Sequence, residues 1–400
     1  MSARASIPVL VLGLALASPA HASDVGYLYG RVETVDGDVY QGQLRWGDEE
    51  SFWDDIFNAT KVENPNLQYV DRPALRRLRR EHRGGWDFFF GDDELTHIFA
   101  SRFGDLQRIQ VRRGDDLVVA FRNGEELRLH DGSNDVGADI TVIDPKLGQH
   151  ILRWNRIRAI EFRDTPAKLE GKPGEPIYGT VRAGRFDFTG RIQWDFDECL
   201  TSDKLDGDTE DGRASIRFGD IASIRKYRRG SLVKLKSGSE LYVHGTNDVN
   251  SDNRGVLVKL RDMGTVRIGW GDFDEVTFQA APNSGPSYAD YGAGHQITGS
   301  VATHSERYTG RIVFDLDESW DFELLQGMNG RTEYLIPFRD VVRIQPKGTN
   351  RSVVELRNGL TVELEDSQDV SRKNEGLLVF TDARKPKYVA WRDVDEIVFR

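Results

Sequence analysis

The sequence predicts an all-β fold made of three tandem repeat modules of about 110 residues. The first observation is a short phrase that occurs six times: an aromatic residue, a spacer, usually Asp, an aliphatic residue or Phe, two spacers, and Ile or Val. Its copies are Phe103–Ile109, Trp154–Ile160, Phe218–Ile224, Trp270–Val276, Phe338–Ile344 and Trp391–Ile397. Paired copies lie about 52 residues apart, and the pairs recur about every 115 to 121 residues, which is a period typical of tandem structural units.

The second observation is a hairpin pattern that occurs once in each module. Alternating apolar residues flank a turn pair in residues 117–129, 231–243 and 353–364. Two of the turns are Asn-Gly pairs, which tolerate the positive φ angles of tight hairpins. The third observation is composition, because only 38% of the residues are hydrophobic while 30% are charged. Apolar residues this few must be concentrated on inward faces, which favours thin β structures over helical bundles.

The second and third modules align with each other at a nearly constant offset in residue number. An offset of 120 residues carries Trp194 onto Phe314, and an offset of 121 carries Trp270 onto Trp391. From the first module to the second, the offset falls from 148 at Trp46 to 115 at Phe103. The first module therefore holds roughly 33 extra residues between these two positions.

These patterns divide the chain into modules and linkers. We expect β repeat modules at residues 23–164, 177–279 and 295–400, joined by linkers at 165–176 and 280–294 that are rich in Pro, Gly, Ala and Ser. Half-modules of about 52 residues with about five short strands and a tight turn before the last strand resemble SH3-like or Sm-like barrels in pattern and size. Each module then holds two such units. The alternative is a six-bladed β-propeller, which the placement of linkers after every second unit disfavours.

The first residues predict export. Arg4 precedes an apolar run at residues 7–17, and Ala20-His21-Ala22 supplies the small residues of a cleavage site, so residues 1–22 read as a signal peptide. The mature chain is expected to be periplasmic or secreted. No later segment is apolar enough to predict a transmembrane span. The formal net charge of −11 disfavours nucleic acid as a partner.

An acidic corner follows the second strand of each module and is the predicted metal site. It reads Trp194-Asp195-Phe196-Asp197-Glu198 and Phe314-Asp315-Leu316-Asp317-Glu318, with Trp46-Gly47-Asp48-Glu49 as a shortened first copy. A further carboxylate stands six residues after Asp48, Asp197 and Asp317, at Asp54, Asp203 and Glu323. Such carboxylates suit a hard cation such as calcium, and the predicted ligands are Asp197, Glu198, Asp203, Asp317, Glu318 and Glu323. The alternative is that they cap a single helical turn.

A polar loop precedes a Gly-containing stretch in each module. Its hydroxyl, amide and carboxylate groups suit hydrogen bonding to a sugar or a peptide backbone, and they suit hydrogen bonding within their own loop equally well. The predicted ligand-binding residues are Asn134, Asp135, Asn247, Asp248, Asn253 and Asp369.

The insertion of the first module, placed at residues 51–96, is rich in arginine and aromatic residues. A helix is expected after Asp71, with Leu75 and Leu78 on one face. The predicted partner-binding residues are Arg76, Arg77, Arg79, Arg80, Arg83, Trp86, Phe88 and Phe89. They would dock an anionic partner, or else neutralise acidic neighbours in the same chain and cover an open sheet edge.

No catalytic motif is present, because the sequence has no Gly-x-Ser-x-Gly, no His-Glu-x-x-His and no Walker loop. The lone Cys199 matches Ser319 in the third module and is interpreted as a loop residue. We expect a non-enzymatic β-repeat binding or scaffold protein of the bacterial cell envelope, with an envelope protein or polysaccharide as partner and no cofactor apart from calcium. The alternatives are a calcium- or carbohydrate-binding secreted protein, and a hydrolase of envelope polymers.

Overall fold

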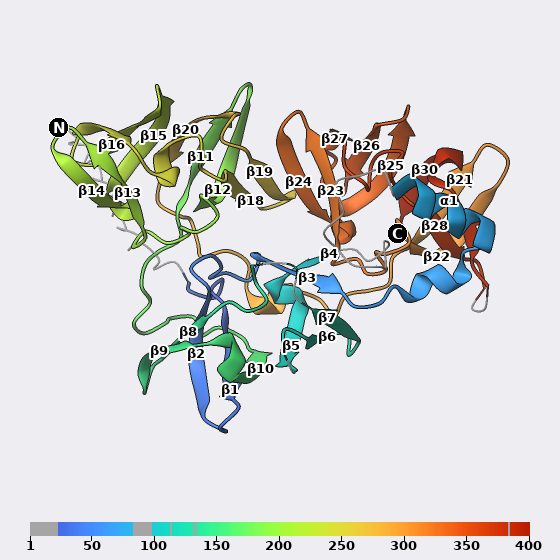
Figure 1. Cartoon of the computed structure of the whole chain (residues 1–400), viewed down its shortest axis with the longest axis horizontal. Helices are drawn as coiled ribbons and strands as arrows, with labels where there is room; N and C mark the ends of the chain where they lie inside the picture. The colour runs from blue at the N-terminus through green and yellow to red at the C-terminus, as the bar shows by residue number, and fades with distance from the viewer. Residues whose placement is uncertain (1–22, 83–97, 113, 131, 133, 383–384) are drawn as a thin grey trace, which may run out of the picture.

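The computed structural model describes residues 23–400 apart from residues 83–97, 113, 131, 133 and 383–384, together with the backbone alone at 77 and 79–82. The predicted signal peptide at residues 1–22 lies outside this part. Figure 1 shows three groups of antiparallel strands and, in the described residues, one α-helix, α1 (Arg72–His82). The predicted all-β fold class is therefore confirmed.

We refer to these three groups, in chain order, as modules 1, 2 and 3. Module 1 contains β1 (Tyr29–Thr34), β2 (Val39–Trp46), β3 (Ile56–Lys61), β4 (Ile98–Arg102), β5 (Leu106–Val111), β6 (Leu117–Phe121), β7 (Glu126–His130), β8 (Ile140–Asp144), β9 (Gly148–Leu152) and β10 (Ile157–Phe162). Module 2 contains β11 (Tyr178–Ala183), β12 (Phe186–Trp194), β13 (Lys204–Thr209), β14 (Gly212–Arg217), β15 (Ile221–Tyr227), β16 (Gly230–Leu235), β17 (Glu240–His244), β18 (Val256–Leu260), β19 (Gly264–Ile268) and β20 (Phe273–Phe278). Module 3 contains β21 (Thr298–Thr303), β22 (Arg307–Val313), β23 (Leu324–Asn329), β24 (Thr332–Pro337), β25 (Val341–Lys347), β26 (Arg351–Leu356), β27 (Thr361–Glu365), β28 (Leu377–Phe380), β29 (Lys387–Val389) and β30 (Val394–Phe399).

The strands of the three modules pair in the same order. Module 1 is a sheet of order β4-β3-β7-β6-β5-β10-β1-β2-β8-β9. The corresponding strands of modules 2 and 3 make the same pairs, so that β15 joins β20 as β5 joins β10, and β12 joins β18 as β2 joins β8. The sheet consists of two five-stranded halves that meet at the β5–β10 pair. Outward from this pair, β6, β7, β3 and β4 in one half correspond to β1, β2, β8 and β9 in the other.

The six-fold phrase forms the centre of each sheet. In five of the six copies the aromatic residue begins a short 3-10 turn, such as Phe103–Asp105 or Trp154–Arg156, and the residue after that turn begins the central strand. The last residues of the two phrases of a module then face each other across the central pair, as Ile109 does with Ile160 and Ile344 with Ile397. The 52-residue spacing is therefore the spacing between the two central strands, which pair antiparallel.

The two five-stranded halves are not consecutive in the chain. Strands β3 to β7 form one half from a continuous segment, whereas β1 and β2 combine with β8, β9 and β10 to form the other. One half is thus inserted into its partner, and the β5–β10 pair joins both into one sheet. Separate propeller blades do not match this pairing, because the described strands form one ten-stranded and one twenty-stranded sheet.

Modules 2 and 3 share the larger sheet. Strand β19 pairs with β24, with Thr265 opposite Leu335, and one continuous hydrophobic core runs through both modules. Module 1 has its own core, which the linkers and the corners of modules 2 and 3 help to cover with Leu169, Tyr288 and Phe322. Figure 1 shows module 1 lying below the row formed by the other two modules.

The extra residues of module 1 connect β3 to β4. The corresponding connections in modules 2 and 3 are tight turns, at Thr209–Gly212 and Asn329–Thr332, so the insertion begins at residue 62 rather than at residue 51. It contains the 3-10 turn η1 (Pro65–Tyr69) and α1. The carboxylate of Asp71 caps the start of α1 by accepting the Ala74 N–H at 2.7 Å.

The apolar side of this insertion packs on module 3. The cluster consists of Val70, Ala74 and Leu78 with Val313, Leu316, Leu378 and Phe380. Helix α1 therefore lies against β22 and β28, far in sequence from its own module (Figure 1).

Candidate functional site

The acidic corners have one backbone geometry in all three modules. The first aromatic N–H donates to the carbonyl four residues later, from Trp46 to Glu50, Trp194 to Glu198 and Phe314 to Glu318, each at 2.8 Å. The turn uses positive φ angles at the two residues after Trp194 and Phe314, and at Gly47 in the first corner. The first corner is therefore as long as the others, and its Glu50 is the equivalent of Glu198 and Glu318.

A carboxylate nine residues after the aromatic closes each corner. Asp203 accepts the backbone N–H groups of Cys199 and Leu200 at 3.0 and 2.8 Å. Glu323 accepts the matching pair in module 3, and Asp55 accepts the matching pair in module 1. The equivalent residue in the first corner is thus Asp55, one position after the Asp54 that spacing alone indicated.

The predicted polar loop and the predicted acidic corner come together in each module. Asp135 Oδ2 accepts the backbone N–H of Asn58 at 2.6 Å, and Asp248 and Asp369 accept the matching N–H groups at 2.7 and 2.6 Å. The indole N–H groups of Trp46 and Trp194 donate to the carbonyls of the same loops. Each loop therefore holds its aspartate beside the glutamate of its corner, giving one carboxylate cluster per module.

The closing carboxylates also join the modules. Asp203 pairs with Arg45 of module 1 at 2.9 Å. Glu323 pairs with Lys61 of module 1 at 2.7 Å, and Asp55 pairs with Lys259 of module 2 at 3.4 Å. The sequence did not single out these three cations, although each lies at or near the end of a strand beside a corner. Asp203 and Glu323, which were predicted as calcium ligands, are thus engaged by backbone N–H groups and by cations of another module.

The corner of module 2 contains its own cation. Arg254 pairs with Asp197 and lies 3.6 Å from Asp195. Burial, followed by the nearby Asp248 and Asp197, raises the pKa of Glu198 to about 9, so this side chain is protonated at neutral pH.

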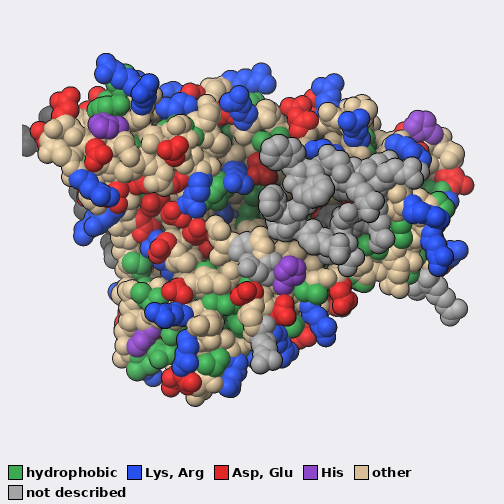
Figure 2. Space-filling model, in the orientation of Figure 1, with side chains coloured by type: hydrophobic (Ala, Val, Ile, Leu, Met, Phe, Trp, Pro, Cys, Tyr) green, Lys and Arg blue, Asp and Glu red, His purple; other side chains and the backbone are tan. Residues whose placement is uncertain are grey.

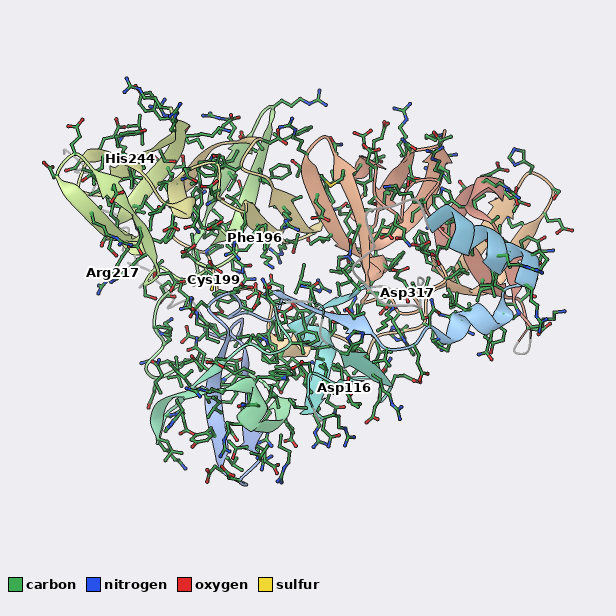
Figure 3. All side chains as sticks on the ribbon, viewed as in Figure 1. Asp116, Phe196, Cys199, Arg217, His244 and Asp317 are labelled. Carbon is green, nitrogen blue, oxygen red and sulfur yellow. The ribbon has the colours of Figure 1, made fainter. Side chains whose placement is uncertain are left out.

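The amides of the module 2 loop hydrogen-bond within the module. Asn247 donates to Asp195, and Asn253 donates to the Asp248 carbonyl and accepts the N–H of Gly255. The predicted ligand-binding residues of this copy are thus in contact with their own loop and corner. Figure 3 places Phe196 of this corner at the edge of module 2 nearest module 1, with Cys199 at their junction.

The corner of module 3 receives its cation from module 1. Lys61 Nζ lies 3.1 Å from Asp317 and donates to Glu323, and Figure 3 shows Asp317 where module 3 faces module 1. Burial lowers the pKa of Lys61, but Asp317 and Glu323 outweigh it and raise that pKa above its ordinary value. Burial and the neighbouring Asp369 and Asp317 raise the pKa of Glu318.

The corner of module 1 lines a cavity. Carboxylate oxygens of Glu49, Glu50 and Asp135 lie within 4.8 Å of one another. They line a cavity of about 130 Å³ together with Asn134 and with Asp197 of module 2. Burial, and for Glu49 also the nearby Asp197, raises the pKa of Glu49 and of Asp135 to about 7. Figure 2 shows acidic side chains gathered where module 2 meets module 1.

The predicted partner-binding residues are described only in part. Arg76 is exposed on α1. The side chains of Arg77, Arg79 and Arg80, and all of Arg83, Trp86, Phe88 and Phe89, lie outside the described residues.

The lone cysteine is part of a module junction. Cys199 is buried in the module 1 core, and its Sγ lies 3.4 Å from the Ser51 hydroxyl. Burial raises the pKa of the thiol, which keeps it protonated and unreactive.

The protonated Glu198 predicts a pH dependence of stability. Its folded pKa of about 9 lies above the ordinary glutamate value of 4.5, so between these values the folded chain holds a proton that the unfolded chain releases, and stability falls as pH rises. Glu198→Gln imitates the protonated acid. Relative to wild type, we expect it to gain roughly 2 kcal/mol of stability between about pH 6 and about pH 9, after allowance for partial exposure.

Urea unfolding of wild type and Glu198→Gln at about pH 6 and about pH 9, in the presence of a chelator, measures this difference in stability. Asp187→Asn, a substitution of an exposed carboxylate on β12, serves as the control and should leave the pH dependence as in wild type. A Glu198→Gln chain with the wild-type pH dependence would show that Glu198 is ionised in the folded state.

Comparison with protein-family models, with curated proteins and with solved structures finds no match to this chain. Within the described residues, no helix combines the length and the apolar character needed to cross a bilayer.

Proposed function

We propose that this chain is an exported, non-enzymatic binding or scaffold protein of the bacterial cell envelope, and that α1 is its main contact surface. The observation that carries the proposal is the docking of α1 on module 3. Ala74 and Leu78 are buried against that module, whereas Arg72 and Arg76 on the same helix are exposed. A basic surface fixed in place inside an acidic protein suits an anionic partner.

Contacts between the modules fix the position of this helix. Module 1 supplies α1 and is joined to module 3 by the buried Lys61 ion pairs and by stacking of Phe121 on Phe322 at 4.7 Å. It is joined to module 2 by Arg45 with Asp203. A partner therefore meets a preorganised surface, which reduces the entropy lost on binding.

The partner is an envelope protein or an acidic envelope polysaccharide. The arginine guanidinium group binds carboxylate and phosphate groups with two parallel hydrogen bonds, and both groups are common on such partners. A carbohydrate site at the polar loops is less well supported, because Asn253 is buried and hydrogen-bonded within its own loop.

The test is capture of a partner from cell-envelope extract by the chain from residue 23 to residue 400. A chain with Arg72→Glu and Arg76→Glu is expected to lose at least roughly tenfold of the captured material, because two exposed positive charges become negative. The control is Arg153→Glu, an exposed arginine of module 1 that follows β9 and does not belong to α1. It should capture as much as wild type.

Point substitutions are needed here because deleting residues 51–96 would remove β3 and the Asp55 corner. Equal capture by the wild-type and the Arg72/Arg76 chains would contradict the proposal. So would an absence of any captured protein or polysaccharide.

A further inference from the structure

We propose that the corner of module 1 binds one divalent cation of the calcium type through Glu49, Glu50 and Asp135. The site stands apart from the proposed function, because it is defined by this cluster and not by α1. It also differs from the predicted calcium site, whose ligands Asp203 and Glu323 pair with cations of another module.

The geometry of the cluster fits the ion. Calcium binds oxygen ligands at about 2.4 Å, so ligand oxygens on one ion lie up to about 5 Å apart. One carboxylate oxygen from each of Glu49, Glu50 and Asp135 lies within 4.8 Å of the other two. The cavity that they line, about 130 Å³, leaves room for the ion and for water molecules that complete its coordination.

Glu50 gives a second and independent indication of a ligand. Its side chain is 7% exposed and lines the cavity. Among the hydrogen bonds and ion pairs of the described residues, none involves its carboxylate, and the nearby Lys259 pairs with Asp55 instead. A carboxylate buried in this way is costly unless a cation or proton neutralises it.

In the other two corners, the aspartate that corresponds to Glu49 pairs with a protein cation. Lys61 Nζ lies 3.1 Å from Asp317 in module 3, and Arg254 pairs with Asp197 in module 2. In module 1 two cations lie beside the cluster. Lys259 pairs with Asp55 at 3.4 Å, and Arg254 lies 3.7 Å from Glu49. The corners of modules 2 and 3 lack the compact three-oxygen cluster, which within the described residues is found only in module 1.

Asp197 and Asp48 strengthen the attraction for a cation, since both line the same cavity. Asp197 belongs to module 2, so the ion would lie at the junction of two modules. Its binding is therefore expected to stabilise that junction as well as the corner.

The test is a calcium titration of the chelator-treated chain from residue 23 to residue 400, followed by calorimetry and by thermal unfolding. We expect one calcium per chain and a rise in Tm of roughly 2 °C or more at saturation. Glu50→Gln should weaken binding by roughly tenfold or more. The matched control is Glu318→Gln, which changes the equivalent buried glutamate of module 3 and should bind as wild type.

Two results would overturn the proposed calcium site. Absence of binding up to about 10 mM calcium, above the weak range of extracellular calcium modules, would overturn the site. Equal binding by wild type and Glu50→Gln would overturn it as well. If Glu50→Gln fails to fold, Glu49→Gln replaces it, because Glu49 is only half-buried and should show the same loss. The calcium titration contains no partner. Its outcome therefore does not depend on whether the capture experiment succeeds.

Discussion

Lys61→Met is expected to lower the free energy of unfolding by about 3 to 5 kcal/mol, the usual cost of removing one partner from a buried ion pair. Methionine keeps the length and the apolar stem of the side chain, so the loss comes mainly from charge. Asp317 and Glu323, which lie 3.1 and 2.7 Å from Lys61 Nζ, would remain buried without their cation. Both carboxylates are under a tenth exposed, so water cannot replace the ammonium group.

The measurement is equilibrium unfolding in urea at neutral pH. The control is Arg351→Met, which removes an ion pair of the same 2.7 Å length to Glu363 on the surface of module 3. An exposed pair of this kind contributes about 1 kcal/mol or less. Similar losses in the two variants would mean that Lys61 is solvated in solution and that modules 1 and 3 are not locked together there.

Gly190→Ala is expected to be the second severe substitution, with a loss of about 3 kcal/mol or more. Gly190 on β12 faces Gly179 on β11 across the ladder. A Cβ at Gly190 would lie 2.1 Å from the backbone oxygen of Lys259, so β12 and β18 would have to separate. The corner of module 2 begins at Trp194, the last residue of this strand pair. The separation of the strands should therefore disturb the corner as well.

The same close approach is found at Gly42 and Gly310, where a Cβ would lie 1.9 and 2.0 Å from a backbone oxygen. The control for Gly190→Ala is Gly269→Ala, because a Cβ there meets no atom within 4 Å. Thermal unfolding of both variants tests the prediction. A Gly190→Ala chain as stable as Gly269→Ala would show that the strands can move apart at little cost.

The sequence predicts the fold class well because its strongest signals are local. The six-fold phrase marks a turn and the start of a central strand, and the Asn-Gly pairs mark the β6–β7 and β26–β27 hairpins. It does not reveal that one half of each module is inserted into the other. Strand β1 pairs with β10 through Gly30 and Phe162, and no residue pattern identifies partners so far apart.

The candidate site was found as two separate loops for a similar reason. The Asp135 loop and the Glu50 corner are distant in the chain, and the N–H of Asn58 on β3 holds Asp135 in place. The spacing of acidic residues after Trp46 points to Asp54 as the closing carboxylate of the first corner. The backbone hydrogen bonds show that this carboxylate is Asp55. The cations Lys61 and Lys259 come from other modules, so their role depends on how the modules pack.

The insertion of one half-module into the other sets an order of assembly. Strands β3 to β7 are neighbours in the chain and can pair as soon as that segment is available, because closing short loops costs little entropy. The hairpin of β1 and β2 has to wait for β8 and β10. In a chain delivered from its N-terminus, each module therefore keeps its earliest strands incomplete until its last strand arrives.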